Sequence, residues 1–115
     1  MEKYAIKDIQ ELIQMAQTTK NIFATLKADF KLTYEELYIL NYIHASNSGS
    51  FNVREIVKTS QLKPYYVTKA VQKLKELGYL SKKRNEMDER TVIIEVSKAQ
   101  RRKIDTLFEK LRVIL

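Results

Sequence analysis

The fold of this chain is constrained most strongly by one feature of its sequence, a predicted helix that leads directly into a basic hairpin. Residues 63–78 read KPYYVTKAVQKLKELG, and residues 79–96 read YLSKKRNEMDERTVIIEV. Proline is favoured at the first position of a helix, and glycine is favoured just after its last turn, so Pro64 and Gly78 mark a start and a stop. A helix followed at once by such a hairpin is typical of a recognition helix and its wing. The pattern predicts a DNA-binding protein of the winged-helix type.

Positive charge is concentrated in the same stretch. The chain has 115 residues and a formal net charge of +7. Residues 1–62 are neutral overall, residues 63–84 carry +6, and residues 85–115 carry +1. A solvated helix face usually mixes signs, so charge of one sign favours a surface that binds a polyanion such as nucleic acid. The length fits a single domain, which we predict to span residues 1–115.

Several classes of protein are disfavoured. Cysteine is absent, which excludes disulfides, thiolate catalysis and cysteine-ligated zinc. No apolar run is long enough to cross a bilayer, and the first ten residues lack the apolar core of a signal peptide, so we expect a cytoplasmic protein without a membrane contact. His44 is the only histidine and is expected to be a surface or packing residue. We expect no enzymatic activity, no cofactor, no metal and no obligate small-molecule ligand.

Capping signals and apolar spacing divide the rest of the chain. Thr33 and Glu36 form one capping box, and Ser97 and Gln100 form another. Asn52 precedes a short helix that leads, through a brief turn, to Pro64, which is the helix-turn-helix arrangement. The predicted order is helix, helix, short strand, helix, helix, strand, strand, helix. The predicted fold class is mainly α with a small β-hairpin, with a helix-turn-helix over 53–78, a wing over 79–97, and dimerisation helices over 1–30 and 98–115.

The first and last helices carry wider apolar stripes than a small domain needs. The first, over residues 4–30, would be about 35–40 Å long at 1.5 Å per residue. One interpretation is that the stripe only covers the core; the other is that part of it meets a second subunit. We favour the second, because a compact DNA-reading head does not require so long a helix. The predicted homodimer contacts are Ile6, Ile9, Ile13, Ala16, Leu107, Leu111 and Ile114.

The helix over 64–77 has two distinct faces. At 100° per residue its apolar residues gather on one side, and the opposite side is polar at the N-terminal end, which usually contacts base edges. The residues expected to face base edges are Tyr65, Thr68, Lys69 and Gln72. The lysines expected to hold the DNA backbone are Lys63, Lys73, Lys75, Lys82 and Lys83. The alternative is a solvated face with ordinary lysines, and Tyr66 fits the core as well as a contact.

Two arginines stand near the ends of the wing. The narrow minor groove of an A·T-rich tract concentrates negative potential and attracts arginine, so Arg84 and Arg90 are candidates to enter it. The alternative is that one of them pairs with Asp88 or Glu89 to shape the turn. We favour a mixed role, although the spacing does not say which arginine takes which part. The adjacent carboxylates are weak evidence for a metal site without a partner histidine.

Three stretches resemble the staphylococcal accessory regulator (SarA) family of MarR-type winged helices. They are YEELYILNYI (34–43), KPYYVTKAVQKLKELGYLSKKRN (63–85) and DERTVIIEV (88–96). The resemblance covers nearly the whole chain and is weakest over 1–30 and 44–52. It implies a homodimeric winged helix that binds A·T-rich promoter DNA and regulates virulence genes. It also implies DNA contacts from Lys69, Lys73, Lys82, Lys83, Arg84 and Arg90, with Asp88 and Glu89 as an acidic pair in the wing.

Two other functions were weighed against DNA binding. A winged-helix module that binds another protein would expose an apolar face on the helix over 64–77, and this face is polar and basic. A protein of the membrane surface would need a basic helix with a large exposed apolar face. The apolar face of this basic helix is accounted for by core packing.

Some relatives in the family carry one redox-sensitive cysteine in the first helix, and this chain has none.

Overall fold

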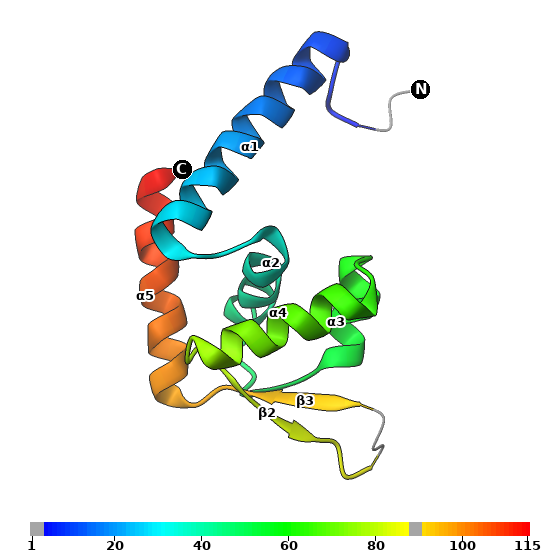
Figure 1. Cartoon of the computed structure of the whole chain (residues 1–115), viewed down its shortest axis with the longest axis vertical. Coiled ribbons are helices and arrows are strands. Elements are labelled where there is room, and N and C mark those ends of the chain that lie inside the picture. The colour runs from blue at the N-terminus through cyan, green and yellow to red at the C-terminus, as the bar shows by residue number, and fades with distance from the viewer. Residues whose placement is uncertain (1–3, 88–90) are drawn as a thin grey trace. The chain divides into compact units, whose positions relative to one another are not determined.

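A computed structural model describes residues 4–87 and 91–115 of the chain. The elements follow the predicted order (Figure 1): α1 (Ile9–Phe30), α2 (Tyr34–His44), β1 (Ser50–Asn52), α3 (Val53–Ser60), α4 (Pro64–Glu76), β2 (Ser81–Arg84), β3 (Val92–Glu95) and α5 (Lys98–Ile114). The residues form two compact units, of which the first comprises the chain up to Thr33 together with Leu115, and the second comprises Tyr34–Ile114. The predicted fold class, mainly helical with a small sheet, is confirmed.

The sheet of the second unit has three antiparallel strands in the order β1-β3-β2. β3 is central, and Ile94 lies opposite both Phe51 of β1 and Lys82 of β2. The predicted hairpin is therefore extended by a short edge strand. The two hairpin strands cover less of the chain than the wing predicted over 79–97. The residues before Ser81 complete the end of α4, and Ser97 already caps α5.

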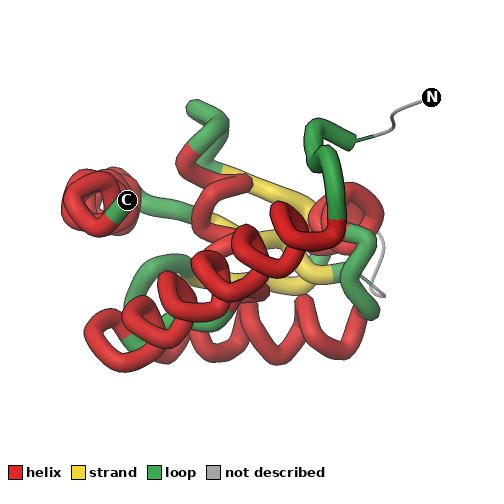
Figure 2. The backbone as a smooth tube through the Cα atoms, turned by 90° about the horizontal axis from the view of Figure 1, so that it is seen from above, coloured by secondary structure: helices red, strands yellow, loops and turns green. Residues whose placement is uncertain are grey.

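The core of this unit lies where α2, α3 and α4 pack against one another and against β3. The apolar face predicted for α4 is confirmed, since Val67, Ala70, Val71 and Leu74 are buried. They pack in a core that also buries Ile39, Leu40, Ile43, Ile56, Leu80 and Ile94. Burying the face of α4 fixes which of its residues point outward, because residues three and four apart share one side of a helix. α5 stands at one side of the unit, where Figure 2 shows it almost end-on.

Local capping explains where the helices begin. Ser97 and Gln100 form the predicted reciprocal box, with the Ser97 N–H donating to Oε1 of Gln100 at 2.9 Å and the Gln100 N–H donating to Oγ of Ser97 at 3.1 Å. The Oδ1 of Asn52 accepts from the N–H of Arg54 at 2.8 Å, and α3 starts at the next residue, as predicted.

The predicted start of the first helix was wrong. Asp8 is extended, and its Oδ1 accepts from the N–H of Glu11 at 2.8 Å, so α1 begins at Ile9 rather than at residue 4. An aspartate side chain satisfies an unpaired N–H at a helix start and competes with continuation of the helix in the N-terminal direction. Ile6 therefore lies before the helix and does not share its apolar stripe.

The C-terminal end of α4 closes with two backbone hydrogen bonds. The N–H of Gly78 donates to the carbonyl of Lys75, and the N–H of Tyr79 donates to the carbonyl of Leu74, both at 3.0 Å. This pattern is a Schellman motif, and it needs a residue in the left-handed region. Gly78 has a φ of 85°, so the predicted stop at this glycine is confirmed.

Gly78→Ala is expected to lower the free energy of unfolding by about 1–2 kcal/mol, the cost of a left-handed conformation for a residue with a Cβ. The added Cβ would also lie 3.1 Å from Nζ of Lys103. Urea denaturation followed by circular dichroism measures the change. Gly49→Ala is the matched control, because Gly49 has no positive φ and its Cβ would meet the carbonyl of Val96 at an ordinary 3.4 Å. Equal stability in the two variants would contradict this role of Gly78.

None of the helices in the described ranges combines the length and the apolar character that a bilayer crossing requires.

Candidate nucleic-acid interface

The outward face of α4 carries the polar residues that the sequence placed there. All four residues predicted to face base edges are exposed: Tyr65, Thr68, Lys69 and Gln72. They lie on the side of the helix away from the buried residues of the core. The exposure of this face is thus established, and contact between these side chains and DNA stays a prediction.

An aromatic and basic cluster marks the first turns of α4. Tyr65 is 67% exposed, and its ring packs edge-on against the ring of Tyr66, with centroids 5.6 Å apart. Nζ of Lys69 lies 6.0 Å from the centroid of Tyr65, one helical turn away. Tyr66 is 47% exposed, so it does not belong to the core. The first turn holds no acidic side chain, so the positive end of the helix dipole is not neutralised there.

Lys73 differs from Lys69, although both were predicted to contact DNA. Nζ of Lys73 lies 4.0 Å from Oε2 of Glu36, a carboxylate of α2 that is buried. A cation held beside a buried carboxylate has part of its charge compensated within the protein. The DNA contact of Lys73 stays a prediction, and the geometry favours Lys69 over it.

The basic run of the wing is divided between the two faces of the sheet. Residues directly opposite in an antiparallel pair share a face, and Lys82 and Arg84 lie opposite Ile94 and Val92. Lys83 lies opposite Ile93 on the other face, where its Nζ is 3.4 Å from Oε2 of Glu95. The linear sequence suggested one cluster, but side chains alternate along a strand. Lys82 and Arg84 therefore lie on one face of the sheet, and Lys83 lies on the other.

The base of the wing loop is fixed by Asn85, a residue that sequence reasoning did not single out. Its Nδ2 donates to Oγ1 of Thr91 at 2.9 Å, its N–H donates to the carbonyl of Thr91 at 3.2 Å, and its Oδ1 accepts from the N–H of Met87 at 3.0 Å. An asparagine at the end of a strand, followed by polar turn residues, is the local signal for this arrangement. Three predicted wing residues lie outside the described residues: Asp88, Glu89 and Arg90.

Within the second unit, the two candidate DNA-binding elements share one side. Figure 1 shows the N-terminal end of α4 and the outer end of the hairpin on the side of the unit opposite α5. Arg84 is exposed at the end of β2, near the outer end of the hairpin. The N-terminal end of α4 and the outer part of the hairpin thus lie on the same side of this unit.

Three contacts made by α5 with distant segments were also missed by the sequence analysis. The guanidinium of Arg101 donates to the carbonyl of Ile43 at 2.7 Å and to that of Ser48 at 2.5 Å. Nζ of Lys103 donates to the carbonyl of Leu77. These pairs are 26 to 58 residues apart along the chain, and backbone acceptors leave no trace in the residue types.

His44 is exposed and also packs against α5, in agreement with the expected surface or packing role. Its ring stacks on that of Phe108, with centroids 4.3 Å apart and an angle of 4° between the planes. Its Nδ1 lies 3.0 Å from Oδ1 of Asp105, so it joins α2 to α5. Across the described ranges, no group of three acidic or histidine side chains is placed to hold a metal ion.

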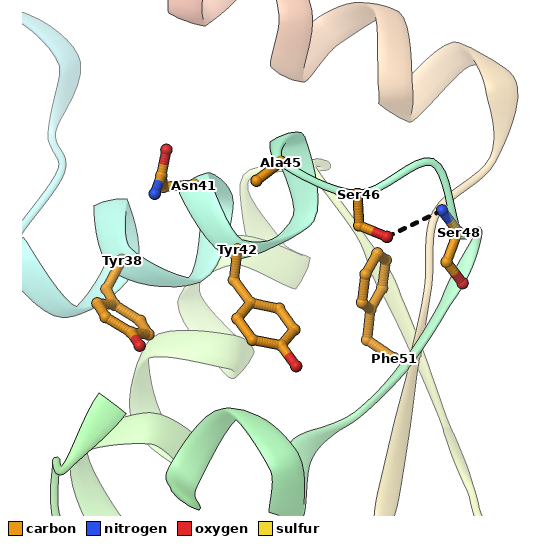
Figure 3. A pocket seen from close by; sticks show the side chains of 7 residues that line it. All are labelled: Tyr38, Asn41, Tyr42, Ala45, Ser46, Ser48 and Phe51. Carbon is orange, nitrogen blue, oxygen red and sulfur yellow. Dashed lines mark hydrogen bonds between the residues drawn. The ribbon is translucent and has the colours of Figure 1, made fainter. Parts of the chain in front are cut away.

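An open pocket of about 410 Å³ lies between α2 and β1. Figure 3 shows the rings of Tyr38 and Tyr42 projecting from the same side of α2, with Phe51 beyond them. The rings of Tyr42 and Phe51 meet edge-on at 6.0 Å. The remaining lining residues are Asn41, Ala45, Ser46 and Ser48. No lysine or arginine lines it, so it is not an extension of the basic surface.

The residues predicted for the dimer interface differ in exposure. Ile9 and Ile13 of α1 are 68% and 47% exposed, and Ala16 is exposed as well. In α5, Leu107 and Leu111 are buried and Ile114 is half-buried. The exposed apolar residues of α1 are compatible with contact to a second subunit. The two leucines of α5 are buried within the single chain. The interface itself stays a prediction.

Sequence comparison places the chain among known regulators. The family model described as transcriptional regulator SarA/Rot matches residues 21–107. The HTH-type transcriptional regulator SarR of Staphylococcus aureus (strain USA300) is 48% identical over 106 residues, which cover 92% of this chain and 92% of the relative. The transcriptional regulator SarA of Staphylococcus aureus (strain Newman) is 35% identical over 105 residues, which cover 91% of this chain and 85% of the relative.

Structural comparison finds the same fold at lower sequence identity. Reduced AbfR bound to DNA is similar with a TM-score of 0.74 and 17% identity, over 90% of this chain and 74% of that one. MarR is similar with a TM-score of 0.71 and 16% identity, over 92% of this chain and 76% of that one. The two TM-scores establish the MarR-type winged-helix fold, and at identities this low they establish the fold alone.

Proposed function

The chain belongs to the SarA/Rot family of transcriptional regulators, and from this premise we propose that it binds double-stranded DNA as a homodimer at A·T-rich promoters. In this proposal α4 enters the major groove and the β2–β3 hairpin reaches the adjacent minor groove. The targets are promoters of virulence or regulator genes, as the family resemblance implies, and the protein acts in the cytoplasm without enzymatic activity.

One observation supports this proposal most strongly. The exposed face of α4 presents several hydrogen-bonding side chains, the wing of the same unit is positively charged, and four apolar residues on the opposite face of α4 are buried in the core. Gln72 has the geometry to bond adenine with both amide atoms, and Lys69 suits the acceptors of guanine. The base edges in the major groove present hydrogen-bond donors and acceptors in fixed patterns, and these side chains can bind them.

The wing supplies the second contact. Arg84 is exposed, shares the face of Lys82, and is not paired with an acid in any contact found within the described ranges. An exposed arginine at the end of a hairpin strand suits a narrow minor groove, where the negative potential is strongest. Lys83, beside Glu95, is better placed for a weaker phosphate contact from the other face.

The dimer follows from the geometry of the duplex and from α1. Two recognition helices can read successive major grooves only if they lie about 34–36 Å apart on one side of DNA. The exposed apolar residues of α1 offer the surface for such a pairing. Solved structures of AbfR are described as bound to DNA, and this supports DNA as the ligand of the fold.

A protein-binding winged helix is the alternative, and the exposed rings of Tyr65 and Tyr66 are the observation that favours it. The two functions differ in their dependence on salt. Binding to DNA releases counterions from the phosphates, whereas aromatic contacts with a protein do not depend on salt in this way.

The salt dependence of binding to an A·T-rich duplex tests the proposal. Log K is expected to fall with log salt by about 0.9 for each phosphate neutralised, so three contacts from each protomer would lower the affinity about 10³-fold between 50 and 200 mM salt. Fluorescence anisotropy of a labelled duplex measures this slope, and a G·C-rich duplex of equal length is the control for sequence preference. A flat salt response would favour the protein-binding alternative.

A further inference from the structure

The C-terminal end of α4 is held by a side chain of α5. Nζ of Lys103 donates to the carbonyl of Leu77, the C-cap residue directly after α4, which has no acceptor role in the Schellman motif. The same ammonium lies 4.5 Å from the centroid of the Tyr79 ring. A cation is favoured at the C-terminus of a helix, where the dipole is negative, and over the face of an aromatic ring.

The surroundings are adapted to this contact. Gly78 sits between Leu77 and Tyr79, and a Cβ on it would come within 3.1 Å of the Lys103 ammonium. Burial raises the pKa of the Tyr79 hydroxyl above its usual value, so the ring beneath the ammonium stays neutral at physiological pH. The absence of a side chain at position 78 therefore permits both the left-handed turn and the approach of the lysine.

Nearby residues fix α5 itself against the rest of the unit. Arg101 donates to the carbonyls of Ile43 and Ser48, and Asp105 pairs with His44. Three residues within five positions of α5, Arg101, Lys103 and Asp105, thus contact the end of α2, the loop before β1 and the end of α4. Arg101 and Asp105 thus fix the segment of α5 that carries Lys103.

We propose that Lys103 is a positioning residue for DNA reading, which fixes the tilt of α4 through the carbonyl of Leu77. This proposal rests on the function proposed above. The 13 residues of α4 span about 20 Å, so a tilt of about 3° around the C-terminal end moves the N-terminal end by about 1 Å. Bidentate base contacts fail at such a displacement, while long lysines still reach phosphates, so losing Lys103 reduces discrimination between sequences more than overall affinity.

The competing explanation is that Lys103 binds a DNA phosphate. The two roles predict different results in Lys103→Met, which keeps most of the side-chain stem but removes the ammonium. A lost phosphate contact makes the slope of log K against log salt concentration shallower by about 0.9 for each protomer. It leaves the sequence preference unchanged. A lost positioning contact leaves the slope unchanged and lowers the ratio of affinities for A·T-rich and G·C-rich duplexes, which we expect to fall about tenfold.

The experiment compares wild type, Lys103→Met, Lys103→Arg and Lys110→Met. Lys110 is an exposed lysine of the same helix and is the matched control. Amide hydrogen exchange without DNA is the independent readout: Gly78 and Tyr79 should exchange several-fold faster in Lys103→Met and recover protection in Lys103→Arg. Unchanged exchange in Lys103→Met, or an unchanged affinity ratio with a shallower slope, would overturn the positioning role. If the wild-type protein shows no sequence preference, the proposed function fails. Faster amide exchange in Lys103→Met would then establish only the contact between Lys103 and the Leu77 carbonyl.

Discussion

Replacing Lys69 and Gln72 together with alanine is expected to lower the affinity for a preferred A·T-rich duplex by about 10³-fold or more. Each good base contact contributes about 1–3 kcal/mol of discrimination, and a dimer would lose four of them. Affinity for an unrelated duplex should fall much less, because only the Lys69 charge contributes to non-specific binding. Both side chains are exposed, so the fold should not change.

Competition binding with preferred and unrelated duplexes at one salt concentration measures both effects. Lys110→Ala controls for the loss of one positive charge elsewhere on the surface, and circular dichroism checks that the double variant remains helical. If the double variant keeps its preference for the A·T-rich duplex, α4 does not read the bases, and the assignment of the recognition helix must be withdrawn.

The elements of the fold were predictable because their signals are local. Pro64, Gly78 and the box of Ser97 and Gln100 act within three residues of the helix ends that they define, so the residue types alone reveal them. The buried face of α4 was predictable for the same reason, since helical periodicity relates residues three and four apart. The start of α1 was missed because Asp8 offered a cap within an apolar pattern that extended further toward the N-terminus.

The candidate site was predictable in its residue types but not in its contacts. The exposure of Tyr65, Lys69 and Gln72 follows from the helix alone. The pairing of Lys73 with Glu36 depends on how α2 packs against α4, and neither residue type nor spacing reveals such a tertiary contact. Lys103 could not be identified for the same reason, because its acceptor is a backbone carbonyl 26 residues away.

These contacts change which lysines are expected to matter. The net charge of residues 63–84 suggested that all their lysines face DNA. In the structure Lys73 and Lys83 lie beside carboxylates, whereas Lys69 and Arg84 are exposed without such a partner in any contact found in the described ranges. An ion pair at the surface contributes little to stability, but it competes with a phosphate for the same ammonium. We therefore expect Lys69 and Arg84 to contribute more to binding than Lys73 and Lys83.

Ile13→Asp is expected to convert the dimer into monomers and to lower affinity for the duplex by about 10²–10⁴-fold, because two linked half-sites gain that much from binding together. Ile13 is 47% exposed in the single chain, so the substitution should leave the fold of one protomer intact. A carboxylate buried in an apolar interface without a partner strongly disfavours association. Sedimentation at two protein concentrations measures the assembly, and anisotropy measures the binding.

Thr18→Asp is the matched control for this prediction. Thr18 is exposed on the same helix and lies about 140° around it from Ile13, at 100° per residue. The same charge is thus added to α1 on a different face, with a similar effect on helix propensity. A monomeric Ile13→Asp variant beside a dimeric Thr18→Asp variant would locate the interface on the apolar stripe. If both remain dimeric and bind DNA equally, α1 does not carry the interface, and the pairing must be sought on another element.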